Sequence, residues 1–270
     1  MELNEKNYYS VEANMEYMSV SQYKDFTQCE FYGLMKAKGE WVEKKSPALL
    51  QGGYMDAHFS NRLEEYKNEN PDLFKKDGTL LQKYEDVNTY IQVAENDEFF
   101  MNHIQGRTQV IVSGTIKGVK WKGCYDFLNT RIVDMKLVAS IREMVWKYDP
   151  LTKRNYQTNF ISAYGYDTQG CIYQELGRQV FGINFPFDIA AISKEEEPDK
   201  AIINIDDDIL AKKLDEVSEK AIRYDLIKKG VLEPTKCNNC PCCRRYNKLN
   251  RVITYRELFN IGDEYEENIE

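Results

Sequence analysis

The segment Trp121 to Val138, WKGCYDFLNTRIVDMKLV, decides the fold class of this chain. Apolar and aromatic residues alternate with polar ones on both sides of Asn129, which predicts two strands joined by a short turn. A third run of the same kind precedes them and is separated from them by Gly118. We therefore expect three successive antiparallel strands at residues 109–116, 119–128 and 131–138.

The length of the turn decides which side chains share a face of this hairpin. A two-residue turn places Asp126 opposite Val133, so that the carboxylates of Asp126 and Asp134 lie on opposite faces. A three-residue turn, Asn129 to Arg131, places Asp126 directly across from Asp134, with Cβ atoms about 5 Å apart. In that register Lys136, two residues further on, shares the same face.

Two carboxylates and an ammonium group on one strand face form a chemical unit. Carboxylates this close repel each other unless a cation lies between them, and hard oxygen ligands suit Mg²⁺ or Mn²⁺. A neighbouring lysine can orient an attacking water or stabilise negative charge on a phosphate. Asp126, Asp134 and Lys136 are therefore the candidates for a metal-dependent catalytic centre.

Helical periodicity prevails on either side of these strands. The pattern predicts helices at 19–37, 47–66, 86–101, 158–180 and 207–229, strands at 187–193 and 200–205, and a loop at 71–79. Gly52 and Gly53 weaken the second helix by roughly 1 kcal/mol each unless the backbone must pass close to another group. The order of elements predicts an α/β fold with a mixed sheet flanked by helices.

Length and composition exclude several classes of protein. The chain has 270 residues, 42% of them hydrophobic, and a net charge of -8, which favours one folded domain over a disordered or collagen-like chain. We expect a single domain over 1–270, with an N-terminal extension at 1–17 and a cysteine-rich basic segment and acidic tail at 230–270. No apolar run approaches ~20 residues and no signal peptide is evident, so we expect a cytoplasmic protein without a membrane segment.

The candidate residues resemble a known nuclease signature. Asp126, followed by Asp134-Met135-Lys136 on the next strand, resembles the motif of the PD-(D/E)XK nucleases. Gln169 and Tyr173 resemble the Q-x-x-x-Y motif of the RecB-like and phage recombination exonucleases, the group of exonuclease VIII (RecE) and lambda exonuclease. Upstream, SVSQYKDFTQCEFY (19–32) and LLQGGYMDAHF (49–59) resemble the first two helices of that group. The motifs follow the family's order from about residue 18 to about residue 245.

This resemblance implies a restriction-endonuclease-like core and a role for each matching residue. The metal ligands would be Asp126, Asp134 and the main-chain carbonyl of Met135, while Lys136 would position or activate water. Gln169 and Tyr173 would orient the lysine or contact the DNA strand. The resemblance further implies digestion of duplex DNA ends from 5′ to 3′ in phage-type recombination, a ring-like homo-oligomer, and a single-strand annealing protein as partner.

The glycine-containing helix departs from the family pattern. Members of the family often carry a metal-binding histidine four residues after the glycine, and that position, counted from Gly52, is Asp56. His58 lies two residues further on, about 200° around a helix, so both side chains cannot face the same metal. We expect Asp56 to assist as an oxygen ligand and keep His58 as the reserve candidate.

Four of the seven cysteines lie within seven residues, in the sequence CNNCPCC from Cys237 to Cys243. This density favours a metal site in a reducing compartment over disulfides, although no second C-x-x-C pair follows. RecB-like relatives with an iron–sulfur cluster use one cysteine of the first helix and three near the C-terminus. The resemblance therefore implies Cys29, Cys237, Cys240 and Cys243 as ligands of a 4Fe-4S cluster; Zn²⁺ and a metal-free group remain alternatives.

Basic residues gather at the same end of the chain. The candidates for contact with nucleic acid are Lys228, Lys229, Lys236, Arg244 and Arg245. Such a group could follow a phosphate backbone, in which case affinity would fall steeply with salt. The competing hypothesis is a nuclease fold that has lost catalysis, or a cysteine-metal module that binds DNA or protein, and retention of both aspartates with the lysine argues against it.

Overall fold

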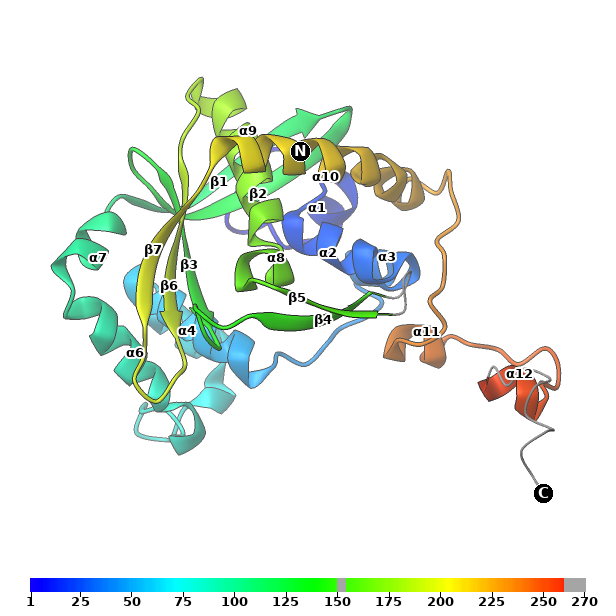
Figure 1. Ribbon diagram of the computed structural model, residues 1–270, viewed down its shortest axis with the longest axis horizontal. Helices are drawn as coiled ribbons and strands as arrows, with labels where there is room; N and C mark the ends of the chain where they lie inside the picture. Colours follow the sequence, from blue (N-terminus) through cyan, green and yellow to red (C-terminus); the bar gives the residue numbers. More distant parts are fainter. Residues whose placement is uncertain (150–153, 260–270) are drawn as a thin grey trace.

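The computed structural model describes residues 1–149 and 154–259. Five strands form its main sheet in the order β1-β2-β3-β6-β7: β1 (Arg107–Ile116), β2 (Val119–Leu128), β3 (Ile132–Val138), β6 (Phe187–Ser193) and β7 (Lys200–Ile205) (Figure 1). The three predicted successive strands are antiparallel, as expected. β3 then pairs in parallel with β6, and β6 pairs antiparallel with β7. The predicted mixed sheet is confirmed.

The hairpin between β2 and β3 has the three-residue turn. Phe127 pairs with Val133 and Leu128 with Ile132, which leaves residues 129–131 in the turn. Asn129 closes it, because its side-chain oxygen accepts a hydrogen bond of 2.9 Å from the backbone N–H of Arg131. The ladder between β2 and β3 consists of these two pairs, whereas all seven residues of β3 pair with β6. The sheet therefore opens between β2 and β3 at the level of Asp134.

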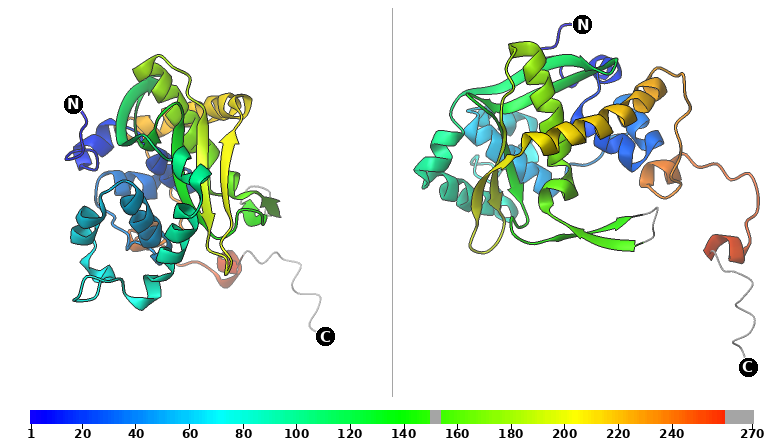
Figure 2. Two further views of the ribbon diagram at one scale, coloured as in Figure 1. Left: turned by 90° about the vertical axis from the view of Figure 1, so that its left-hand side faces the viewer. Right: turned by 45° about the horizontal axis from the view of Figure 1, so that its top comes forward.

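Helices cover both faces of the sheet (Figure 2). On one face, α2 (Val20–Gln28), α9 (Tyr166–Phe181) and α10 (Asp207–Lys228) enclose a core that includes the fully buried Trp121 and Tyr125. On the other face, α4 (Pro47–Phe59), α6 (Asp86–Glu95) and α7 (Glu98–His103) pack around Phe100, Phe127 and Val133. The arrangement is that of a restriction-endonuclease-like α/β fold, as predicted.

The predicted helix at 19–37 is two helices, because the chain turns at Cys29. Cys29 is extended, with φ −166° and ψ 122°, and α3 (Glu30–Ala37) starts directly after it. The turn folds α3 back against α2 so closely that a Cβ on Gly33 would lie 2.7 Å from the ring of Phe26. Ser19 caps α2 as expected, since its hydroxyl accepts the N–H of Gln22.

Two further predicted helices are also divided. The helix expected at 47–66 ends at Phe59, and α5 (Leu63–Glu69) follows a turn in which Asn61 adopts φ 58°. The helix expected at 86–101 divides at Asp97, whose carboxylate accepts the N–H of Phe100 and caps α7. Apolar residues keep a helical spacing across such short turns, and for this reason periodicity alone does not reveal them.

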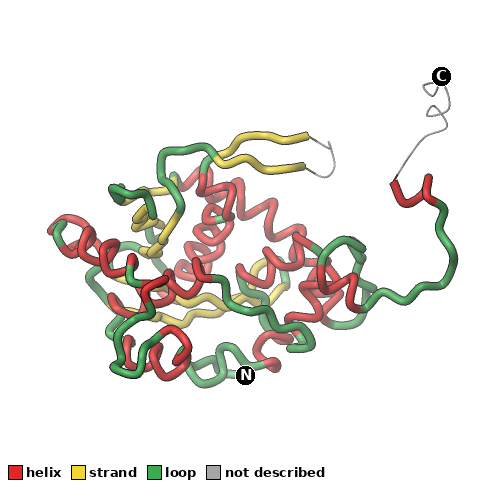
Figure 3. Tube along the Cα trace, turned by 90° about the horizontal axis from the view of Figure 1, so that it is seen from below, coloured by secondary structure: helices red, strands yellow, loops and turns green. Residues whose placement is uncertain are grey.

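A two-stranded hairpin was not predicted. β4 (Val145–Asp149) pairs with β5 (Arg154–Thr158) and stands out from the body of the molecule in Figure 3. Its second strand includes Thr158, which was predicted to be the first residue of a helix at 158–180. The rest of that helix is divided at Gly165, φ 65°, into α8 (Phe160–Tyr164) and α9. Along the chain the hairpin lies between β3 and α8, and α8 precedes α9, the helix that carries Gln169.

Short elements lie near both ends of the described chain, in the loop predicted at 71–79 and just after that loop. They are α1 (Val11–Glu16), η1 (Pro71–Leu73), η2 (Gln82–Tyr84), α11 (Pro241–Arg245) and α12 (Tyr255–Phe259). α12 lies away from the body in Figure 1, and the acidic residues 264–270, which end the segment predicted at 230–270, fall outside the described residues. Among the helices that the structure describes, none combines the length and apolar character needed to cross a bilayer.

Candidate active site and cysteine site

Asp134 and Lys136 form a buried ion pair on β3. The side chain of Asp134 is 1% exposed, and its Oδ2 contacts the Nζ of Lys136. Lys136 Nζ also donates to the main-chain oxygen of Met135 at 3.2 Å. Although burial opposes the positive charge, the carboxylates of Asp134 and Asp126 raise the pKa of Lys136. The lysine is therefore a cation at neutral pH and is suited to stabilise negative charge.

Asp126 lies where β2 and β3 separate. Its Oδ2 accepts the backbone N–H of Met135 at 2.9 Å, at the point where the ladder between the two strands has ended. Burial, and then the negative charges of Asp134 and Asp56, raise the pKa of Asp126 well above its usual range. A divalent cation would relieve this repulsion.

Asp56 turns toward this group, whereas His58 does not. Asp56 accepts hydrogen bonds from Arg62 Nη2 at 3.1 Å and from Gln109 Nε2 at 3.3 Å. Its pKa is raised, chiefly by burial, and the charges of Lys136 and Asp134 both act on it. His58 Nε2 instead lies 2.8 Å from Glu95 Oε1 on α6. The two residues thus occupy different sides of α4.

Gln109 is a site residue that the sequence pattern did not reveal. The register of β1 and β2 places it opposite Asp126, but it has φ 53°, which is unusual for a residue other than glycine. Tyr125 and Phe127 pack on opposite faces of the sheet, so the strand alternation is interrupted at Asp126. The strained backbone turns the Gln109 amide toward Asp56, which is typical of functional sites.

Gln169 and Tyr173 approach the centre from α9. Gln169 Nε2 donates to Asp134 Oδ1 at 2.6 Å, so it holds the aspartate and not Lys136. Tyr173 is 8% exposed, and its ring packs against Tyr125 with a centroid distance of 5.0 Å. Burial, followed by Tyr8 and the carboxylates, raises the pKa of Tyr173 well above its usual value, so its hydroxyl stays neutral.

These residues fit a divalent cation. Within the described chain, the buried Asp134 Oδ2 has no polar partner other than the ammonium group of Lys136. Its sole charged partner there is Lys136, and the nearby Asp126 supplies a second hard oxygen donor. In the described residues the carboxylate oxygens of Asp56, Asp126 and Asp134 do not form one compact group of three.

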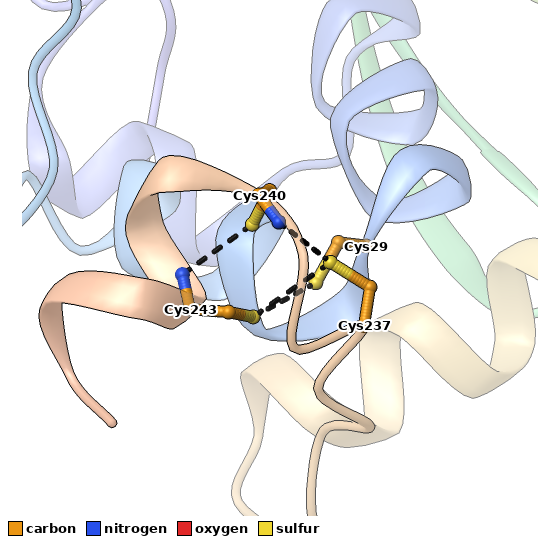
Figure 4. A group of neighbouring side chains, drawn as sticks. All are labelled: Cys29, Cys237, Cys240 and Cys243. Carbon is orange, nitrogen blue, oxygen red and sulfur yellow. Dashed lines mark hydrogen bonds between the residues drawn. The ribbon is translucent and has the colours of Figure 1, made fainter. Parts of the chain in front are cut away.

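The predicted proximity of Cys29 to the C-terminal cysteines is confirmed (Figure 4). The sulfur atoms of Cys29, Cys237, Cys240 and Cys243 all lie within 4.8 Å of one another. Cys29 Sγ is 3.5 Å from Cys243 Sγ, which is 3.9 Å from Cys237 Sγ. The turn between α2 and α3 places the first of these thiols, and α11 places the last.

Backbone amides of the loop prepare these sulfurs for a cation. The N–H of Cys240 donates to Cys237 Sγ at 3.3 Å, and that of Cys243 donates to Cys240 Sγ at 3.4 Å. Although burial opposes it, such bonds, including one from Asn239, lower the pKa of Cys237 to about 6. Burial and the neighbouring thiols raise the pKa of Cys243 to about 12. One thiolate is thus available at neutral pH, and a bound cation would stabilise the others.

The basic candidates divide into two groups. Lys236, Arg244 and Arg245 are exposed and have no carboxylate partner in the described part of the chain, whereas Lys229 pairs with Asp225. The prediction for Lys228 is wrong: its side chain is buried, and Nζ donates to Tyr17 O at 2.7 Å and to Gln22 Oε1 at 3.0 Å. Lys228 belongs to a run of basic residues in the sequence, but it lies on the face of α10 that packs into the interior.

Buried Lys228 makes stability depend on pH. Burial, opposed by Asp225, lowers the pKa of Lys228 to about 7, so the folded chain binds fewer protons than the unfolded chain between pH 7 and about 10. The free energy of unfolding should therefore rise by ~1 kcal/mol per pH unit above pH 7.5. Urea unfolding at several pH values measures this rise. Lys228→Met should reduce the slope, Lys229→Met should not, and equal slopes in all three proteins would contradict the prediction.

Comparisons with known proteins agree with this geometry. The family described as "PDDEXK-like domain of unknown function (DUF3799)" matches residues 19–246. The crystal structure of a protein named "Putative exonuclease" from Eubacterium rectale is similar to this chain, with a TM-score of 0.88 and 40% identity over 96% of this chain and 98% of that chain. No curated protein matches.

Proposed function

This chain belongs to the DUF3799 family of PDDEXK-like domains, a branch of the PD-(D/E)XK nuclease superfamily, and from that premise we propose that it is a metal-dependent exodeoxyribonuclease. The observation that carries the proposal is the buried ion pair of Asp134 with Lys136, which lies beside a second buried carboxylate, that of Asp126. A structural ion pair would not need a second, repelled carboxylate at the same place.

Each side chain has a distinct task in this proposal. Asp126, Asp134 and the Met135 carbonyl would hold Mg²⁺ or Mn²⁺, with Asp56 binding it through water. The cation would lower the pKa of a water molecule and neutralise charge on the scissile phosphate. Lys136, held as a cation by Asp134, would orient the attacking water and stabilise negative charge on the phosphate. Gln169 would fix Asp134, and Tyr173 would support the helix that carries Gln169.

The finer activity rests on resemblance and on the exonuclease name of the similar structure. We propose digestion of duplex DNA ends from 5′ to 3′, with a ring-like assembly of identical subunits and a single-strand annealing protein as partner. Lys229, Lys236, Arg244 and Arg245 would contact the phosphate backbone outside the active site.

Incubation with linear and circular duplex DNA, with and without added Mg²⁺, tests this function. Linear DNA should be degraded only with Mg²⁺, and covalently closed circles should remain intact because they offer no end. Hydrolysis of the circular DNA would show that the protein is an endonuclease and not the proposed exonuclease. Binding of either DNA without any hydrolysis would favour the inactive nuclease fold or DNA-binding module.

For the cysteine site we propose a single Zn²⁺ ion. A tetrahedral ion with metal–sulfur bonds of about 2.3 Å holds its sulfurs about 3.8 Å apart, close to the 3.5 and 3.9 Å separations here. A four-iron cluster would spread them further, because iron and sulfide atoms would lie between them. Protein purified without oxygen should be colourless and contain one zinc per chain. A brown protein that absorbs near 400 nm would establish the iron–sulfur alternative.

Asp56 and His58 should differ in their effect on the metal requirement. Asp56→Asn should lower activity about tenfold at limiting Mg²⁺, since it removes a charge that acts on the metal site, and higher Mg²⁺ should restore part of it. His58→Ala should stay within twofold of the unmodified protein, because His58 faces Glu95. Titration of activity against Mg²⁺ compares the two variants. Equal losses, or a loss at His58 alone, would show that the assignment of the two positions is reversed.

A further inference from the structure

A row of lysine and tyrosine side chains leads outward from the proposed active site. Lys136 Nζ lies 5.4 Å from the ring centroid of Tyr166, and Lys24 Nζ lies 5.4 Å from the same centroid. The Tyr166 and Tyr164 rings are 6.0 Å apart, and Lys147 Nζ lies 5.2 Å from the Tyr164 ring. We call these five residues the lysine–tyrosine track. It runs from β3 past α2, α8 and the start of α9 to the β4–β5 hairpin.

Two lysines of the track have no anionic partner. Neither Lys24 nor Lys147 forms an ion pair or a hydrogen bond within the described residues, although the chain as a whole is acidic. Lys24 contacts the same Tyr166 ring as Lys136. Burial and then the charge of Lys136 lower the pKa of Lys24 to about 8, although the charges of Asp134 and Asp167 oppose this shift. A phosphate beside either ammonium group would supply the anionic partner that it lacks.

The tyrosines supply exposed rings against which the bases of a nucleic acid could stack. Tyr164 is 42% exposed, and Tyr156, which lies across from Lys147 in the hairpin, is 49% exposed. Aromatic rings interleaved with cations bind nucleic acid by stacking on bases, and this requires bases that are not already stacked in a duplex. The β4–β5 hairpin joins β3 to α8, so the track is continuous with the strand that carries Asp134 and Lys136.

We propose that the lysine–tyrosine track binds single-stranded DNA that enters or leaves the active site, with phosphates on the lysines and bases against Tyr164. This inference rests on the proposed nuclease function and specifies its substrate: one unpaired strand, and not the intact duplex, contacts the hairpin side of the site.

Binding measurements test the track without hydrolysis. Fluorescence anisotropy would follow a labelled oligothymidylate of about 20 nucleotides and a blunt duplex of equal length, with Ca²⁺ in place of Mg²⁺. Tyr164→Ala should weaken oligothymidylate binding about tenfold without changing its salt dependence. Lys147→Ala should also weaken it, and should lower the slope of log Kd against log salt by about 0.7. Neither variant should change affinity for the blunt duplex by more than about twofold.

A matched control lies elsewhere on the surface. Lys83 is exposed, has no ion-pair partner in the described chain, and stands 4.8 Å from the ring of Tyr84 in η2. Lys83→Ala removes the same charge from the same kind of contact and should leave binding unchanged. Three results would each overturn the track. Tyr164→Ala could bind oligothymidylate with unchanged affinity. Tyr164→Ala could lose as much affinity for the blunt duplex as for oligothymidylate, or Lys83→Ala could lose as much affinity for oligothymidylate as Lys147→Ala does.

Failure of the nuclease proposal gives a different result. If the unmodified protein binds oligothymidylate through Tyr164 and Lys147 but cuts no DNA in Mg²⁺, the track stands and the nuclease function falls. If it cuts DNA and both variants bind and cut as the unmodified protein does, the nuclease function stands and the track falls. Far-ultraviolet circular dichroism of each variant verifies that the fold is retained.

Discussion

Replacing Asp134 with asparagine should reduce DNA hydrolysis at least ~100-fold, the largest effect that we expect from a single substitution. The change keeps the shape of the side chain but removes the charge that would bind the cation and hold Lys136 in place. Lys136→Ala should cause a loss of similar size. Initial rates on end-labelled linear DNA, at saturating Mg²⁺, measure both losses.

Asp188 provides the matched control for Asp134. Its side chain is 2% exposed, and its Oδ2 accepts hydrogen bonds from His103 Nε2 at 2.7 Å and Arg131 Nε at 2.6 Å. It lies on β6 beside Val133, so its side chain is on the opposite face of the sheet from that of Asp134. Asp188→Asn should lower the thermal midpoint but retain most of the activity of folded protein. Comparable rates in the two variants would disprove the assignment of Asp134.

Replacing Cys243 with alanine should remove the bound metal and lower the thermal midpoint by about 10 °C. The thiol is one of four that converge between α3 and α11, and a cation held by them stabilises only the folded chain. Metal content by mass spectrometry and thermal unfolding by circular dichroism measure the two effects. We expect catalysis at low temperature to fall less than in Asp134→Asn.

The neighbouring Cys242 separates metal binding from loss of a buried side chain. Cys242 is 0% exposed and belongs to the same short helix, yet its sulfur lies outside the group of four. Cys242→Ala should keep the metal and lose only the stability of one small buried group. If Cys242→Ala and Cys243→Ala lose metal and stability equally, the four-cysteine site is incorrect.

The sequence predicted the strands of the sheet better than the helices. Alternation of polar and apolar residues located β2, β6 and β7 at their observed ends, because strand periodicity stops where the sheet stops. The predicted helices ran through the turns at Cys29, Asn61 and Asp97, since the apolar spacing continues across them. The hairpin at 145–158 was missed because its exposed aromatic residues form no buried face.

The proposed site followed a similar division. Asp126, Asp134 and Lys136 could be grouped from the sequence because a hairpin register fixes neighbours at short range. Gln109 could not be assigned to the site from the sequence, since its role depends on a backbone φ of 53° that the residue type does not predict. The contact between Lys24 and Tyr166 was also not predicted, because it joins α2 to α9 and these helices are far apart in the sequence. Long-range contacts of ordinary residue types leave no local pattern.

The cysteine site also joins two parts of the chain that are made at very different times. Cys29 and Cys243 are 214 residues apart, so synthesis at roughly 5–20 residues per second separates them by roughly ten to forty seconds. In the second half of that interval Asp126, Asp134 and Lys136 have been made, but Cys29 still lacks the C-terminal thiols with which it groups. A chain that terminates early would therefore carry the catalytic strands without a fixed first helix. The cysteine site would therefore fix the start of α3 only once the last part of the polypeptide has been made.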